Sequence, residues 1–389
     1  MDLALCYESV IPSRGGAETY IADLARRLAR DGHSVHLYGC RRDATALPAS
    51  LHFHRLDVPT GPRFLRPWRF AAACERALPD ARHDVSIGFD KTWGQDVLFP
   101  QGGLHAASAA HNLLKFPHTW QRWLAAAGKW LDPAAWSFAR LERRQYLGPG
   151  RPLVIANSRM VRRHFEEFYG IAPESVRVVH MAIDPLRFAA DDRPRRRQEE
   201  RDRWGVGPDE PVGLFVAMNY RLKGLAPLLR AAALVPRDKP FTLAVVGHPK
   251  VSRYRRLAAR LGVADRVKFL GFRADPKDAY FASDFLVHPT FYDPCSLVVL
   301  EALACGLPVV TTRYNGAAEL LSPPAEGLVI DDPHDAPALA AALGQVLDRG
   351  YRIAASQAAR QAAGRWTFEH HYRALLDVLG EVRRTKRAA

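Results

Sequence analysis

The stretch DPCSLVVLEALACGLPVVTT, residues 293–312, decides the fold of this chain. Ser296 is a favourable N-cap residue, and residues 297–305 are apolar nearly all round, with one acid, Glu301, among them. A helix that is apolar on every side is a buried helix. A glycine and a proline then end it, and VVTT has the composition of a strand. Together with the apolar residues 285–290 before it, the stretch predicts a strand, a loop, a buried helix and another strand.

Two features of this stretch suit a ligand that carries phosphate and hydroxyl groups. The amino end of the helix, at Ser296, Leu297 and Val298, offers backbone N–H groups and partial positive charge. A carboxylate inside a buried helix, such as that of Glu301, needs a partner. A ligand hydroxyl would serve, and so would a neighbouring arginine or backbone N–H. The residues alone leave these two interpretations open.

Composition bounds the class of protein. The chain has 389 residues, enough for two domains, and its 48% hydrophobic and 25% charged residues are typical of globular proteins. The net charge of +14 favours anionic partners. Five scattered cysteines without a C-x-x-C indicate reduced thiols in a cytosolic protein rather than disulfides or a zinc site. No apolar run reaches the ~18 residues of a membrane span, and no leader is evident, so we expect any membrane contact to be peripheral.

The first forty residues predict a strand, a glycine loop, a helix and a strand, which is a βαβ unit with parallel strands. Gly15 and Gly16 lie at the strand-to-helix turn, where they fit either a simple tight turn or close approach of a ligand. The expected strand segment 96–105 runs into a second glycine pair, 102–103, and His105 follows that pair at the carboxyl end of the sheet. Open α/β sheets bind ligands at that end, although a solvated loop histidine is the more ordinary interpretation.

The segment 111–147 mixes four tryptophans with lysines and arginines. Such an amphipathic segment can lie on an anionic membrane surface, and the tryptophans can equally pack between two helices. The same aromatic residues could stack on nucleic-acid bases, but no nucleic-acid-binding motif elsewhere in the chain supports that interpretation.

The second half predicts another α/β unit. The expected strand 211–218 leads into a loop with Arg221 and Lys223, followed by a helix. Two cations beside a helix amino end can clamp a diphosphate, since charge-assisted bonds meet the phosphate oxygens; ordinary surface cations are the alternative. Gly247 ends the next strand, and Phe272 and Arg273 end the one after it.

We expect four parts along the chain. Residues 1–190 form the first domain, and the highly charged segment 191–207 is a solvated linker and first helix. Residues 208–365 form the second domain, and residues 366–389 form an amphipathic helix that returns to the first domain, with a frayed basic tail.

The spacing from Asp293 through seven residues to Glu301, followed by a small-residue helix and GLPVV, resembles the signature of retaining glycosyltransferases of family 4. The chain departs from that signature at Asp293, where glutamate is usual, and at Ser296, where glycine is usual. The form D-P-C-S is similar to a subgroup related to lipopolysaccharide-core glucosyltransferases. The resemblance implies the GT-B fold, an α/β fold of two doubly wound Rossmann-like domains that face a central cleft.

The resemblance also implies roles. A nucleotide-sugar donor, UDP-linked, would have its ribose bound by Glu301, its diphosphate by Arg221 and Lys223, and its sugar by Asp293. His105 would face the acceptor, and His105, Asp293, Arg221 and Lys223 would form the catalytic set. The residues assigned to the donor are Gly15, Gly16, Arg221, Lys223, Gly247, Phe272, Arg273, Asp293, Ser296, Leu297, Val298 and Glu301. Because no D-x-D motif occurs, we expect no metal and no other cofactor.

These considerations predict a hexosyltransferase that moves glucose from UDP-glucose to a lipid-linked or phosphorylated glycan, such as the inner core of lipopolysaccharide. Its expected place is the cytoplasm, on the anionic inner face of the cell membrane, without a nucleic-acid partner. A nucleotide-sugar epimerase of the same fold, or a basic protein that binds membranes or nucleic acid without catalysis, are the alternatives.

Overall fold

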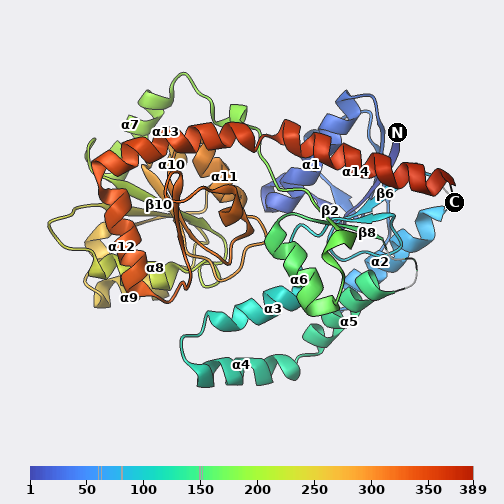
Figure 1. Cartoon of the computed structure of the whole chain (residues 1–389), viewed down its shortest axis with the longest axis horizontal. Coiled ribbons are helices and arrows are strands. Elements are labelled where there is room, and N and C mark those ends of the chain that lie inside the picture. Colours follow the sequence, from blue (N-terminus) through green and yellow to red (C-terminus); the bar gives the residue numbers. More distant parts are fainter. Residues whose placement is uncertain (60, 63, 80–81, 149, 151, 389) are drawn as a thin grey trace. The chain divides into compact units, whose positions relative to one another are not determined.

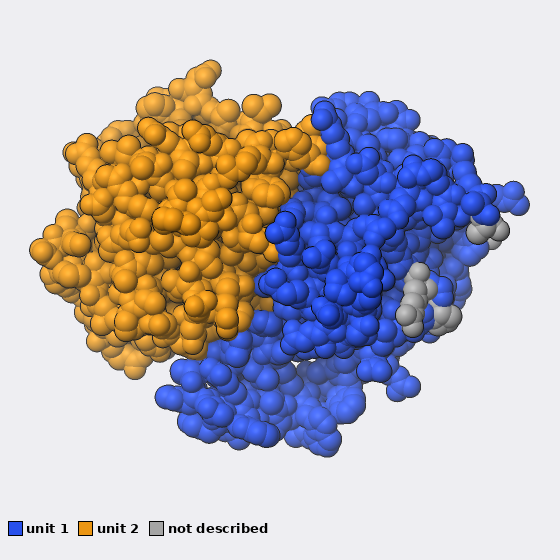
Figure 2. All heavy atoms as spheres, viewed as in Figure 1, with its two compact units in different colours: residues 1–180, 371–389 blue, residues 181–370 orange. Residues whose placement is uncertain are grey.

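The computed structural model describes residues 1–388 except 60, 63, 80–81, 149 and 151. The chain forms two compact units (Figure 1 and Figure 2). Unit 1 comprises Met1–His180 and His371–Ala389, and unit 2 comprises Met181–His370. Each unit contains its own parallel sheet.

The sheet of unit 1 has the strand order β5-β3-β1-β6-β7-β8-β9, and every pairing in it is parallel. Its strands are β1 (Asp2–Cys6), β3 (Ser34–Gly39), β5 (His52–Arg55), β6 (Val85–Gly88), β7 (Val97–Leu98), β8 (Leu153–Ala156) and β9 (Val176–Val178). The expected βαβ unit is confirmed, because β1, helix α1 (Gly16–Arg30) and β3 follow one another and the two strands pair in parallel. The expected strand 96–105 is much shorter, since Pro100 has no N–H for the ladder.

The helices of unit 1 are α1, α2 (Arg66–Ala77), α3 (His105–Leu114), α4 (Thr119–Trp130), α5 (Pro133–Leu147), α6 (Arg159–Tyr169) and, from His371 onward, α14 (Phe368–Ala388). Local signals fix their ends. The Ser158 hydroxyl accepts from the Val161 N–H at the start of α6, and Gly170 ends that helix with φ of +63°.

The sheet of unit 2 has the order β12-β11-β10-β13-β14-β15. Its strands are β10 (Val212–Ala217), β11 (Thr242–Gly247), β12 (Val267–Gly271), β13 (Phe285–His288), β14 (Val309–Thr312) and β15 (Gly327–Ile330). Its helices are α7 (Arg193–Trp204), α8 (Leu225–Leu234), α9 (Ser252–Arg260), α10 (Lys277–Ala282), α11 (Leu297–Ala304), α12 (Ala336–Leu347) and α13 (Arg349–Arg365).

The predicted succession of strand, loop, buried helix and strand is β13, α11 and β14. Helix α11 is buried inside unit 2 through four apolar side chains, those of Val299, Leu300, Ala302 and Leu303. Strands β13 and β14 pair in parallel, with Leu286 opposite Val309. The helix is not buried all round, because Leu297 and Val298 at its amino end remain partly exposed.

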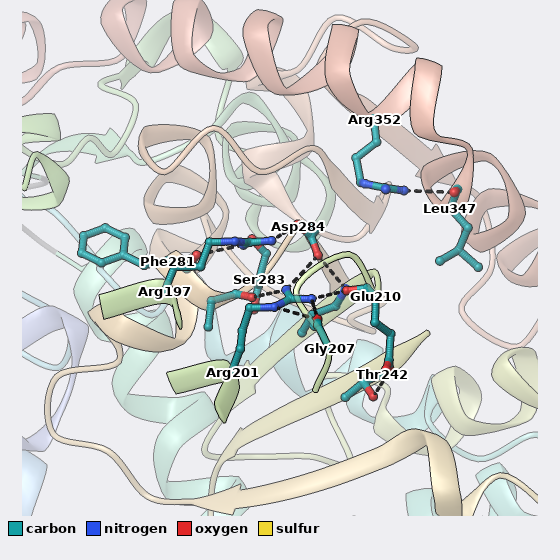
Figure 3. Close-up of polar contacts among 12 residues, drawn as sticks. Arg197, Arg201, Gly207, Glu210, Thr242, Phe281, Ser283, Asp284, Leu347 and Arg352 are labelled. Atoms are coloured by element: carbon teal, nitrogen blue, oxygen red, sulfur yellow. Dashed lines mark hydrogen bonds and ion pairs between the residues drawn. The ribbon is translucent and has the colours of Figure 1, made fainter. Parts of the chain in front are cut away.

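The prediction of a solvated linker at 191–207 is wrong. The segment contains the expected helix, α7, but Arg201 of that helix is only 1% exposed. The Arg201 guanidinium donates to the carbonyl oxygens of Gly207, Glu210 and Ala282, and it lies 3.4 Å from Asp284 (Figure 3). A buried charge is tolerated only when it is paired and hydrogen-bonded, and here the surrounding carbonyls and one carboxylate supply that pairing. The compact units divide at residue 180, not in the charged segment.

The expectation of a frayed basic tail is also wrong. Arg383 Nε lies 3.0 Å from Asp84 Oδ1, and Lys386 Nζ lies 2.9 Å from Asp96 Oδ2. Further up α14, the Tyr20 hydroxyl and His371 Nε2 form a buried hydrogen bond of 2.7 Å. These contacts hold the described end of the helix on unit 1.

Candidate active site

The loops that leave β10 and β13 bring two predicted residues together in unit 2. Lys223 follows β10, and its Nζ donates to Asp293 Oδ2 at 2.7 Å and to the Tyr292 carbonyl at 3.0 Å. The turn requires glycine at position 224, where φ is +82° and a Cβ would lie 2.0 Å from the Pro289 carbonyl oxygen. The close approach of these two loops therefore depends on Gly224.

Asp293 is the centre of this cluster. Its side chain is 14% exposed, and its Oδ2 lies 3.4 Å from His288 Nε2 as well as beside Lys223. Burial alone would raise the pKa of Asp293, but the Lys223 charge and the His288 hydrogen bond outweigh it and hold that pKa well below its usual value. Burial, and then the Lys223 charge, lower the pKa of His288. Asp293 is therefore an ionised carboxylate next to a neutral imidazole and an ammonium group.

Glu301 has a partner that the sequence did not suggest. The Tyr280 hydroxyl donates to Glu301 Oε2 at 2.6 Å. Burial raises the pKa of Glu301 to about 6, although the Tyr280 hydrogen bond and the charge of Arg187 act in the opposite direction. Tyrosine, rather than an arginine or a backbone N–H, satisfies one oxygen of this acid.

Ser296 occupies the N-cap position of α11, but its side chain does not cap the helix. Its hydroxyl instead lies 3.5 Å from His288 Nε2, and its N–H donates to Asn315 Oδ1 at 3.3 Å. The Ser296 side chain, which was expected to cap the helix, therefore contacts His288 of the Asp293 cluster instead. The next two residues, Leu297 and Val298, are partly exposed, so the amino end of α11 is within reach of a ligand.

Four further residues assigned to the donor lie at or after the carboxyl ends of strands in unit 2: Arg221, Gly247, Phe272 and Arg273. Arg221 is exposed at the turn after β10, and Phe272 is 55% exposed after β12. The Arg273 guanidinium lies 3.0 Å from Glu200 of α7, which leaves its backbone as the part that can meet a base. Gly247, with φ of +135°, is required by packing, since a Cβ would lie 1.8 Å from the Ala217 carbonyl oxygen.

Unit 1 contains a pocket of about 800 Å³ at the carboxyl ends of β1, β6 and β7. His105, the first residue of α3, lines it and packs against Phe138 with ring centroids 5.4 Å apart. The N–H groups of His105 and Ala106 donate to the Glu142 carboxylate, which fixes the start of the helix. Burial, and then the charges of Lys91 and Lys129, lower the pKa of His105, so its ring is neutral near pH 7.

Two further pocket residues were missed from sequence. Asp90 and Lys91 lie two and three residues after the end of the buried strand β6, and this position at the carboxyl end of a strand could have marked them as site residues. Asp90 has φ of +58°, uncommon for a residue other than glycine, and its Oδ1 accepts from the Gly102 N–H at 3.0 Å. Backbone strain of this kind clusters at functional sites. Gly15 and Gly16 lie at the start of α1, outside the described lining of this pocket.

The tryptophans of 111–147 do not pack internally, which overturns that alternative. Trp120 is 61%, Trp123 74% and Trp130 68% exposed. We call the exposed side chains of α4 and its flanks the aromatic surface; they are Trp120, Trp123, Leu124, Trp130, Leu131 and Trp136. In Figure 1, α4 lies at the outer edge of unit 1, joined to it by α3 and α5.

Two parallel-sheet α/β units of this kind define the GT-B fold of glycosyltransferases. The structure of WaaG, a glycosyltransferase involved in lipopolysaccharide biosynthesis, matches 97% of this chain and 99% of its own with a TM-score of 0.77 at 24% identity. The structure of HepE from Anabaena in complex with UDP and glucose matches 98% of this chain and 100% of its own, with a TM-score of 0.68 at 20% identity.

The chain belongs to the group 1, family 4 glycosyltransferases. The family described as "Glycosyl transferases group 1" matches residues 196–365, and "Glycosyltransferase Family 4" matches residues 14–187. D-inositol 3-phosphate glycosyltransferase 2 of Catenulispora acidiphila is 30% identical over 87% of this chain and 83% of its own length. The lipopolysaccharide glucosyltransferase WaaG of Escherichia coli K12 is 26% identical over 86% of each chain.

Proposed function

We propose that this protein is a retaining, metal-independent hexosyltransferase that transfers glucose from UDP-glucose to a lipid-linked, phosphorylated glycan such as the lipopolysaccharide inner core. The similarity to WaaG supports the acceptor class, and the solved complex of HepE with UDP and glucose supports the donor. The observation that carries the proposal is the arrangement of Lys223 and Asp293 beside the amino end of α11.

The contacts of Lys223 support its proposed role in binding the diphosphate. An ammonium group has three donors, and the described contacts of Lys223 use two of them, at Asp293 and Tyr292. The third can serve a phosphate oxygen, with Arg221 and the N–H groups at the amino end of α11 as further partners. Asp293 would then accept from hydroxyls of the donor sugar. Glu301, whose Oε2 is held by Tyr280, would accept from the ribose hydroxyls.

The proposed reaction breaks the bond between the anomeric carbon and the oxygen of the β-phosphate. The acceptor oxygen forms its bond to the same carbon on the same face, and its proton passes to the departing phosphate. Negative charge grows on that phosphate as the bond breaks, so the fixed cations Arg221 and Lys223 stabilise the transition state more than the bound donor. They would take the role that a metal ion plays in other transferases.

The pocket of unit 1 suits an acceptor with hydroxyl and phosphate groups. Arg66 and Lys91 line it and can pair with phosphate, and Asp90 can accept from a hydroxyl. The neutral His105 can donate to or accept from the same molecule. An inositol phosphate carries these groups too, and the similarity to D-inositol 3-phosphate glycosyltransferases makes it the second acceptor to test.

The aromatic surface supports placement at the membrane. Exposed indole rings lie at α4, and Arg140 and Arg143 are exposed on the neighbouring α5. Interfacial helices combine aromatic and cationic side chains in this way, because the rings enter the headgroup boundary and the cations meet anionic lipid. Among the described residues, no helix has the length and apolarity needed to span a bilayer. We therefore infer peripheral contact with the inner face of the cell membrane.

A panel of donors tests the proposal. UDP-glucose should raise the melting temperature more than UDP-galactose or GDP-mannose, since a ligand that binds only the native state stabilises it. With a lipopolysaccharide acceptor that lacks its outer sugars, NMR should show an α-linked glucose, and the rate should not change when EDTA is added. Dependence on a divalent ion, or inversion at the anomeric carbon, would contradict the proposal. Epimerised donor in the absence of any acceptor would point instead to an epimerase.

A further inference from the structure

We propose that Asp2, His36 and His83 form a binding site for a divalent transition-metal ion, at the amino-end side of the sheet in unit 1. Asp2 begins β1, His36 lies in β3, and His83 stands two residues before β6. These are three neighbouring strands of one sheet, so residues far apart in sequence converge on one point. Within the part of the chain that the structure describes, the histidine and acidic side chains of this trio lie close enough together to hold one metal ion.

The ligand atoms have the spacing that a small cation needs. One atom from each residue lies within 4.8 Å of the other two. Asp2 Oδ1 is hydrogen-bonded to His83 Nδ1, and Asp2 Oδ2 lies 3.4 Å from His36 Nε2. Two imidazoles and one carboxylate suit Zn²⁺ and related ions. The His83 side chain is 3% exposed and that of Asp2 is 42% exposed, so water can reach the site to fill a fourth coordination position.

Each histidine is already held by its other ring nitrogen. His83 Nε2 lies 2.8 Å from the Tyr38 hydroxyl, and His36 Nδ1 lies 2.8 Å from His54 Nε2. Metal-binding histidines almost always use the second nitrogen in this way, which fixes the tautomer and the ring orientation. Asp2 is fixed too, because its backbone N–H donates to Asp84 Oδ2 at 3.0 Å.

The position assigns the ion a structural role. The pocket of unit 1 lies at the carboxyl ends of β1, β6 and β7, whereas Asp2 and His83 stand at or before the amino ends of β1 and β6. A bound ion would join β1, β3 and the segment before β6 by bonds that the unfolded chain lacks. Its binding free energy would add to the stability of the native state, and sugar transfer would not depend on it.

The test compares zinc binding by tag-free protein stripped with EDTA. Calorimetric titration with ZnCl₂ should show one site per chain, and zinc should raise the melting temperature. The variants Asp2→Asn and His36→Gln should each weaken that site by about 100-fold and remove the thermal shift, and Tyr38→Phe should weaken it by about tenfold. The matched control is His52→Gln, because His52 stacks on His36 at 4.7 Å without belonging to the trio.

Several outcomes distinguish a metal site from a hydrogen-bonded cluster without metal. Cobalt in place of zinc should give visible absorption bands that Asp2→Asn removes. Wild-type protein that binds zinc no more tightly than Asp2→Asn and His36→Gln would overturn the proposal. Circular dichroism of each variant establishes that it is folded, and the two independent single variants keep the comparison valid if one of them is not. Glucosyl transfer that stops on EDTA treatment would contradict the structural role and the metal-independent mechanism together.

Discussion

The ammonium of Lys223 lies 2.7 Å from a carboxylate oxygen of Asp293, and both side chains are less than one fifth exposed at 19% and 14%. Removing one member leaves the other as a buried, unpaired charge. We expect Lys223→Ala to lower kcat/KM for UDP-glucose by about 100-fold or more and to lower the free energy of unfolding by about 3 kcal/mol. Donor kinetics and urea unfolding check these two effects, with the exposed Lys239→Ala as the control.

The double variant Lys223→Met/Asp293→Asn separates stability from catalysis. It removes both buried charges, so much of the lost stability should return while turnover stays low. Turnover that recovers together with stability would show that the pair only holds the loops in place.

Replacing Glu301 should change the pH dependence of stability. The pKa of Glu301 is about 6 in the folded protein, above that of an exposed glutamate. The folded state therefore binds the Glu301 proton more tightly than the unfolded state does. This difference adds to the free energy of unfolding at low pH, and the contribution is lost as the pH rises through about 6. Glu301→Gln should be more stable than wild type by up to about 2 kcal/mol near pH 8, and the difference should shrink towards about pH 4.5. Urea titrations at several pH values measure it.

The same variant should bind the donor less well. The amide of glutamine carries no negative charge and has one accepting oxygen in place of two, so its bonds to the ribose hydroxyls should be weaker and KM for UDP-glucose should rise by about tenfold. Wild-type KM for the donor should rise below about pH 6, where Glu301 takes up a proton. An unchanged KM in Glu301→Gln would contradict the assigned role.

His105→Ala should affect the acceptor and not the donor. The imidazole lines the pocket of unit 1, whereas the backbone N–H that binds Glu142 is retained in the variant. We expect KM for the acceptor to rise by about tenfold or more, with KM for UDP-glucose unchanged. Initial rates with each substrate varied in turn measure this, and the exposed His370→Ala serves as the control. A change confined to the donor would remove His105 from the acceptor side.

The aromatic surface should bind anionic vesicles. Replacing Trp120, Trp123 and Trp130 with serine should weaken co-sedimentation with phosphatidylglycerol vesicles by about tenfold or more. The melting temperature should stay unchanged, since these side chains are exposed. Wild-type binding should fall as salt is added. Ile353→Ser, which removes an exposed apolar side chain from α13, is the matched control and should bind as wild type does.

The variant Gly224→Ala tests whether the loop beside Lys223 depends on the close packing at this glycine. Gly205→Ala, at the end of α7, is its matched control. Both glycines have positive φ, at +82° and +63°, so each substitution costs about 1–2 kcal/mol in backbone strain. At Gly205 nothing lies within 4 Å of the added Cβ, whereas at Gly224 the Pro289 carbonyl oxygen would lie 2.0 Å away. Gly224→Ala should therefore lose about 1–3 kcal/mol more than Gly205→Ala. Equal losses in urea unfolding would show that the loop relaxes freely.

Local patterns made the core of the fold predictable. The helix α11 and its flanking strands follow from an apolar run that Gly306 and Pro308 end, and the first βαβ unit follows from a glycine loop between two apolar strands. These signals act over a few residues, so one sequence carries them. The assignment of Lys223 and Asp293 to one donor site, by contrast, followed only from the resemblance to a family, and their direct contact was not predicted.

Contacts between distant residues could not be predicted. The charged composition of 191–207 concealed the buried Arg201, because its partners include the carbonyl of Ala282, 81 residues away. The partner of Glu301 is Tyr280, on a different helix. Whether the tryptophans of α4 pack inward or face solvent depends on how α3, α4 and α5 are arranged, which the periodicity of one helix does not determine.

The ion pairs that Arg383 and Lys386 make with Asp84 and Asp96 have a consequence for biosynthesis. Residues 1–180 are synthesised before residues 181–370, yet the unit they form is completed only by residues from His371 onward, which are made after the whole of 181–370. A premature stop codon shortly before residue 371 would therefore damage the amino-terminal unit, although every residue encoded upstream of it is unchanged.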